Sequence, residues 1–188
     1  MRKSFVLVPF FVCALAGCAT AQTGERLKVT FDSGVAAYDA GDFANAYRIW
    51  SSITDEDIAA MRNVAMMRRT GTGTEKDPAG AVEMYQRAAD AGLPTAQADL
   101  ADMLLKGEAG PPNVARARPL LEAAAAANHP IAQYELAQLY ETGNQVPQDM
   151  LAARNLYAAA ASHGMKVAAD RLAALGPAPE PAPANKTP

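Results

Sequence analysis

Apolar and polar positions along this chain repeat at a fixed interval of 36 residues. Four alanines carry the repeat most clearly, namely Ala60, Ala96, Ala132 and Ala168. An aliphatic residue follows each of them four positions later, at Val64, Leu100, Leu136 and Leu172. A period of roughly 20 to 50 residues is typical of stacked repeats, because one unit cannot bury its apolar face alone. The pattern therefore predicts an all-α fold, an α-solenoid of stacked antiparallel helix pairs.

The periodicity also sets the expected boundaries of the helical repeat domain, residues 31–176. We predict a degenerate helical hairpin at residues 31–53, full repeats at about 58–92, 94–128 and 130–164, and a capping helix at 165–175 with a polar exposed side. The position just before the second helix of each repeat is occupied by a residue type that caps helix N-termini, at Asp77, Asn113 and Asp149. The register after that helix should adopt a left-handed backbone, and it is occupied by Gly92, Asn128 and Gly164.

Residues 1–17 have the form of a secretion signal. Arg2 and Lys3 precede an apolar run of 12 residues, from Phe5 to Ala16. The run is too short to cross a membrane, which takes about 20 apolar residues. We therefore expect this segment to direct export and to be absent from the mature protein.

The signal ends in Leu15-Ala16-Gly17-Cys18, which resembles the lipobox of bacterial lipoproteins. The resemblance implies cleavage before Cys18 and a lipid on its sulfur. Because Ala19 follows in place of an aspartate, it also implies an outer-membrane lipoprotein that faces the periplasm of a Gram-negative bacterium. The alternative is ordinary cleavage after Ala21, which would leave a soluble periplasmic protein.

Two segments outside the predicted repeats have few large apolar residues. Residues 18–30 are interpreted as the lipidated cysteine and a flexible tether. Residues 177–188, in which proline alternates with alanine, are interpreted as a disordered tail.

Charge and cysteine content narrow the classes of partner. Without Arg2 and Lys3, 15 basic residues stand against 20 acidic ones, which argues against binding to nucleic acid. Cys13 lies in the signal and Cys18 would carry lipid, so the repeats contain no disulfide and no cysteine metal ligand. We therefore expect contact with the membrane through acyl chains alone, and no cofactor or metal.

The repeating unit reads Ala-x3-Leu-Ala in its first helix and Ala-x2-Leu-Tyr-x2-Ala-Ala-x2-Gly in its second, and it is clearest in the third repeat, between Ala132 and Gly164. This unit resembles the Sel-one-like repeat (SLR) family, relatives of tetratricopeptide repeats, over about residues 60–176. The resemblance implies a right-handed superhelix that binds proteins. The chain departs from the family pattern at Ala109 and Gln145, where the family usually has a second turn glycine, so the local turn geometry is the part most open to change.

The sequence shows no arrangement typical of an active site. His129 and His163 stand at predicted helix ends without a nucleophile or ligand cluster nearby in sequence, and we interpret them as solvated loop residues. Carboxylates on neighbouring first helices leave a glycosidase-like pair open. The aromatic residues are interpreted as core, namely Trp50, Tyr85, Tyr140 and Tyr157.

The candidate binding face is the concave surface that first helices line in solenoids. Its positions vary between repeats while the packing positions stay constant. The row also contains Ala98, and the candidate residues on it are Arg62, Met66, Arg69, Asp102, Tyr134 and Gln138. The sequence thus favours a non-catalytic, lipid-anchored adaptor for a protein partner in the cell envelope. The alternatives are a β-lactam-hydrolysing or wall-acting envelope enzyme, as suggested by cysteine-rich SLR relatives, and a structural spacer.

Overall fold

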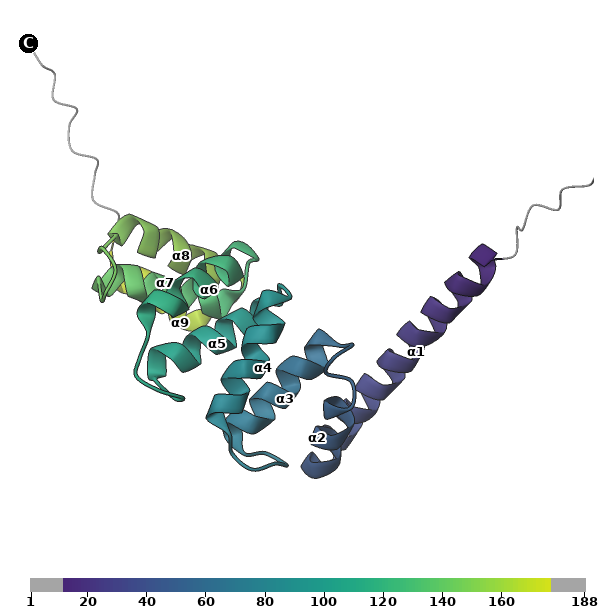
Figure 1. The fold of residues 1–188 in the computed structure, drawn as a ribbon. Helices are drawn as coiled ribbons and strands as arrows, with labels where there is room; N and C mark the ends of the chain where they lie inside the picture. Colours follow the sequence, from purple (N-terminus) through teal and green to yellow (C-terminus); the bar gives the residue numbers. More distant parts are fainter. Residues whose placement is uncertain (1–11, 177–188) are drawn as a thin grey trace, which may run out of the picture. The chain divides into compact units, whose positions relative to one another are not determined.

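The computed structural model describes the backbone of residues 12–176 and the side chains of residues 23–176. In this part of the chain it has nine α-helices and no strand (Figure 1). The helices are α1 (Val12–Asp39), α2 (Phe43–Ser51), α3 (Ile58–Thr70), α4 (Pro78–Asp90), α5 (Pro94–Lys106), α6 (Val114–Ala126), α7 (Pro130–Thr142), α8 (Met150–Ser162) and α9 (Lys166–Ala174). The predicted all-α fold of repeated helix pairs is confirmed.

The chain divides into two compact units, Met1–Asp77 and Pro78–Pro188. In the first unit, residues 23–30 continue α1, so the structure corrects the predicted tether over these positions. The reason is that Leu27 extends the apolar stripe of Phe31, Val35 and Tyr38 by one helical turn and packs against the same core. Of the residues that the structure describes, none belongs to a helix that is both long and apolar enough to cross a membrane.

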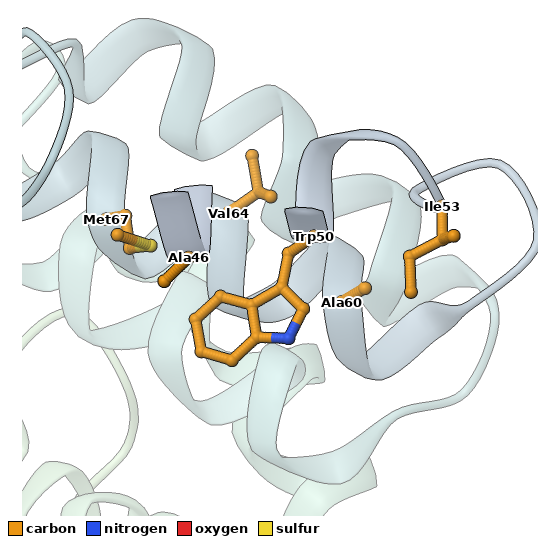
Figure 2. Packing of buried hydrophobic residues seen from close by; sticks show 6 residues of the cluster. All are labelled: Ala46, Trp50, Ile53, Ala60, Val64 and Met67. Carbon is orange, nitrogen blue, oxygen red and sulfur yellow. The ribbon is translucent and has the colours of Figure 1, made fainter. Parts of the chain in front are cut away.

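The core of the first unit is built around Trp50 of α2, whose side chain is 3% exposed. Figure 2 shows the indole among small and aliphatic side chains of α2, α3 and the turn between them, at Ala46, Ile53, Ala60, Val64 and Met67. On the α1 side, the indole Nε1–H donates to the backbone carbonyl of Phe31 at 3.2 Å. Gly34 of α1 is buried against the same ring. Trp50 is therefore a core residue, as predicted.

The second unit is held together by its alanine register. Helices α5 and α6 pack as one antiparallel pair, and α7 and α8 as the next. The repeating alanines are fully buried at Ala96, Ala117, Ala132, Ala153 and Ala168. Helices approach closely at such positions, where a larger side chain would overpack the contact.

The predicted helix ends are present in the structure. Asn113 and Asp149 accept hydrogen bonds from the third backbone N–H of α6 and α8, at 3.0 and 2.9 Å. The positions after the second helices have positive φ: 85° at Gly92, 61° at Asn128 and 86° at Gly164. Local sequence chemistry therefore determines these helix ends.

Helix α9 ends the described repeats. Ala168 is buried against α8, while Lys166 and Asp170 form an exposed ion pair at 2.9 Å. The predicted polar side of this cap is confirmed. The signal residues 1–11 and the Pro/Ala tail 177–188 lie outside the described part of the chain.

Candidate partner-binding site

The first-unit members of the predicted face lie on α3. Arg62 and Arg69 are half-buried there. Met66 packs against the Trp50 core, so at least part of its side chain serves the fold. These residues belong to a different compact unit from Asp102, Tyr134 and Gln138, and the two sets are therefore described separately.

In the second unit, Asp102 of α5 forms an ion pair with Lys106 at 2.8 Å one helical turn later. Its side chain is 20% exposed. Ala98, which we placed in the same row, is 3% exposed and belongs to the core. The row of varying positions is thus partly buried, and its accessible part is smaller than the sequence suggested.

Tyr134 and Gln138 contact each other on α7. The Gln138 side-chain amide donates to the Tyr134 hydroxyl at 3.3 Å, and Gln138 is exposed. The Tyr134 ring is half-buried and lies against Tyr157 of α8, with ring centroids 5.5 Å apart. An aromatic ring braced by a buried neighbour and bordered by an exposed amide is a common type of protein-binding surface.

A polar cluster joins α7, α8 and α9 one turn further along. Glu141 of α7 accepts a hydrogen bond from the buried Tyr157 hydroxyl at 2.6 Å. Arg171 of α9 donates to the same carboxylate through Nε at 3.0 Å and through a second nitrogen. The Glu141 side chain is only 11% exposed. Sequence reasoning missed this cluster as a unit, because Glu141 and Arg171 come from helices that only tertiary packing brings together.

The cluster shifts the titration of its members in opposite directions. The hydrogen bonds from Arg171 lower the pKa of Glu141, with a further contribution from Tyr157, although burial opposes the shift. Burial, followed by the hydrogen bond to the Glu141 carboxylate, raises the pKa of Tyr157. At neutral pH the carboxylate is therefore ionised and the phenol is protonated, which is the state that their hydrogen bond needs.

A family model of the Sel1 repeat matches residues 58–93, 94–129 and 130–165. The chain belongs to the Sel1 repeat family. Proteins of this family generally mediate protein–protein interactions and are typically non-catalytic. A search of curated protein sequences found no match.

Solved Sel1 repeat structures resemble this chain. A Sel1 repeat protein from Oxalobacter formigenes has a TM-score of 0.72 and 29% identity, over 77% of this chain and 60% of that one. A protective antigen of uropathogenic Escherichia coli with an SLR fold has a TM-score of 0.73 and 25% identity, over 78% of this chain and 32% of that one. An immunity protein from Pseudomonas aeruginosa has a TM-score of 0.53 and 25% identity, over 76% of this chain and 58% of that one. This chain thus spans 60% or less of each of these structures.

One contact register recurs in each Sel1 repeat, where the second helix of one hairpin meets the end of the next first helix. In the first unit Arg68 Nε donates to the Tyr47 hydroxyl at 3.1 Å. In the second unit Val82 and Leu104 line one crevice, and the Tyr140 hydroxyl donates to the Glu122 carboxylate at 3.4 Å. The position near the end of the first helix is the same in each repeat, but its partner and its chemistry change.

The histidines do not form a catalytic arrangement with their described neighbours. His129 is half-buried and caps α7, with Nδ1 accepting from the Ala132 N–H at 3.4 Å, which corrects its interpretation as a solvated loop residue. His163 is exposed at the end of α8. Within the described residues, no group of three or more His, Cys, Asp or Glu side chains is placed to hold a metal ion.

Proposed function

We propose that this Sel1 repeat protein is a lipid-anchored adaptor, which holds a protein partner at the periplasmic side of the outer membrane of a Gram-negative cell. The observation that carries the proposal is the Leu15-Ala16-Gly17-Cys18 sequence, a lipobox-like end of a signal, located just before a repeat array of a protein-binding family. The Cys18 side chain itself lies outside the described part of the structure. Each buried methylene contributes about 0.8 kcal/mol to membrane binding, so two or more acyl chains anchor a protein firmly.

The face proposed to hold the partner is the row of first-helix positions. Its best-supported part is the pair of Tyr134 and Gln138, which combines an aromatic ring with an exposed amide. In the same unit, Asp102 on α5 supplies negative charge, which its ion pair with Lys106 partly neutralises. Arg62 and Arg69 on α3 belong to the other unit and form a separate, positively charged candidate surface.

Labelling with radioactive palmitate tests the anchor. The wild-type protein should incorporate label and fractionate with the outer membrane, whereas Cys18→Ser should do neither. Cys13→Ser is the matched control, because it removes the other cysteine of the chain from within the signal and should leave labelling unchanged. Label retained by Cys18→Ser, or a soluble wild-type protein cleaved after Ala21, would contradict the lipid anchor.

Crosslinking in intact cells tests the adaptor role. We expect the wild-type protein to form discrete adducts with one or a few envelope proteins. Arg62→Glu and Gln138→Arg should weaken them, while Lys166→Gln on the capping helix should not. Tyr134→Phe isolates the contribution of the hydroxyl without removing the ring that supports Tyr157. A wild-type protein that forms no adduct would refute the adaptor role, and adducts unaffected by the face variants would remove this face from it.

A further inference from the structure

The turn between the two helices varies among the three Sel1 repeats, and one of its positions differs in apolar character. This position is Thr74 in the first repeat, Gly110 in the second and Val146 in the third. Val146 is 9% exposed, and its side chain lines a crevice beside α6. Gly110 has no side chain to fill the equivalent space beside α4. The second repeat therefore lacks an apolar side chain that the third repeat buries.

The backbone of the second turn also departs from its neighbours. The preceding position is left-handed in the other two repeats, with φ of 71° at Gly73 and 57° at Gln145. In the second repeat the positive φ falls instead on Gly110, at 154°. This is the departure expected at Ala109, since its methyl group disfavours a left-handed backbone.

The space left beside α4 is a crevice of about 180 Å³. Its lining includes Val82 from α4 and the core side chains Met103 and Leu104 from α5, which are 1% and 9% exposed. An apolar cavity of about 150 Å³ is large enough for a benzene-sized group. The crevice in the third repeat has a volume of about 220 Å³ and is lined by the turn around Val146 and by the first residues of α6, which include the buried Val114. Of these two crevices, only that of the second repeat is lined by buried residues of the first helix of its repeat.

A cationic side chain borders the crevice of the second repeat. Arg116 of α6 is exposed, and its guanidinium donates to the neutral side-chain oxygen of Gln86 at 3.2 Å. The Arg116 backbone N–H is held by the cap residue Asn113 at 3.0 Å, which fixes where the side chain begins. The positions equivalent to Arg116 are Gly80 and Ala152. The cation that lines the third-repeat crevice is Arg118, which is already paired with Glu122 at 3.5 Å. A carboxylate would be a stronger acceptor for the Arg116 guanidinium than the present amide.

We propose that this crevice, lined by Val82, Met103, Leu104 and Arg116, binds an extended segment of a partner protein that carries an aliphatic side chain beside a carboxylate. The apolar lining from α4 and α5 favours an aliphatic side chain, the type that Val146 supplies at the equivalent turn position, and Arg116 selects the charge. The proposal rests on the adaptor role and identifies the chemistry of one partner contact, on the turn side of the repeats rather than on the predicted row of first-helix positions.

The minimal probe is N-acetyl-L-valine, which has one isopropyl group and one carboxylate, titrated into the full chain and followed by amide NMR. We expect saturable shifts at residues 107–110 and 116 with a millimolar Kd, as for a ligand of about 11 non-hydrogen atoms. N-acetyl-L-valinamide, which lacks the charge, should bind about tenfold more weakly. No saturable shift would overturn the site, and equal binding of the amide would overturn the role of Arg116.

Two variants with a matched control locate the binding. Ala109→Gln/Gly110→Val reproduces the Gln145-Val146 turn of the third repeat, which avoids valine on the Gly110 backbone, and it should abolish the shifts. Arg116→Gln should weaken binding about tenfold and give the same affinity for acid and amide. Lys166→Gln removes an exposed cation elsewhere and should change nothing. Shifts that persist in the turn variant, with the fold verified by circular dichroism, would overturn the proposal.

Crosslinking in cells separates this proposal from the adaptor role. If wild-type adducts are present and the turn variant reduces them at least tenfold, the crevice holds the partner. If the turn variant leaves them unchanged, the crevice proposal fails and the adaptor role stands. If the wild-type protein forms none, the adaptor role fails. A concentration-dependent dimer that the turn variant abolishes would make another copy of this chain the occupant and overturn the assignment to a partner protein.

Discussion

Gly34 provides the sharpest test of how the first unit is packed. It lies within α1, where alanine would normally be favoured by about 1 kcal/mol. A β-carbon added to Gly34, however, would lie 2.7 Å from Cδ1 and 2.8 Å from Cε2 of Trp50. Distances below 3.0 Å are far inside van der Waals contact, so either the indole or the helix must move.

The expected size of the effect follows from the two opposing terms. Overpacking a filled core costs about 1 to 3 kcal/mol. A shifted indole would also strain its hydrogen bond to the Phe31 carbonyl, a contact that contributes about 0.5 to 1.5 kcal/mol. Against these stands the gain in helix propensity of about 1 kcal/mol. We therefore expect Gly34→Ala to lower the free energy of unfolding of the first unit by about 0.5 to 3.5 kcal/mol.

Gly24→Ala on the same helix is the matched control. Gly24 is exposed, and an added β-carbon there meets no atom within 4 Å. This variant should be neutral or stabilising by up to about 1 kcal/mol. Trp50 is the only tryptophan of the chain, so urea unfolding followed by its fluorescence reports on this unit. If Gly34→Ala stabilised the protein as Gly24→Ala does, the packing of Trp50 against α1 would be refuted.

Three further predictions test the second unit. Because the folded-state pKa of Glu141 is lowered mainly by Arg171, its contribution is present above the unfolded value of about 4.3 and is lost as pH falls through the folded value. Glu141→Gln should thus cost about 1 to 3 kcal/mol at pH 7, and urea midpoints should converge with wild type in acid. Ala101→Leu overpacks a fully buried position and should lower the free energy of unfolding by about 1 to 3 kcal/mol, which a lower thermal midpoint would report. Ala126→Leu, at an exposed helix end, should not lower it. Asn128→Gly, at φ of 61°, should stabilise slightly and Asn128→Ala should destabilise, as measured by calorimetry.

The helix ends were predictable because the signals for them are local. A capping side chain bonds to a backbone N–H three residues later, and a glycine or asparagine ends a helix through its own φ. These contacts are confirmed at Asn113, Asp149 and Asn128. The N-terminal boundary of the repeat domain was less accessible, because residues 23–30 contain one well-placed apolar residue, Leu27, among polar ones. Its partner is the Trp50 core, which is distant in sequence.

The candidate binding face was predicted less well than the helices. Register shows which positions repeat, but not which side of a helix is covered by its neighbours. Met66 and Ala98 shared the register of accessible residues, yet one packs on the Trp50 core and the other is buried. The side-chain directions depend on how helices cross, and a one-dimensional pattern contains no crossing angle.

The sequence by itself determined the repeat frame, the helix ends and the constant small residues, because each depends on spacing or on neighbours a few positions away. Only the tertiary structure decided how individual side chains are used within that frame. Glu141, Tyr157 and Arg171 meet because three helices pack side by side, and Gly34 is required because an indole from another helix lies against it. The crevice beside Arg116 is lined by residues of α4, α5, the following turn and α6, which only three-dimensional packing brings together.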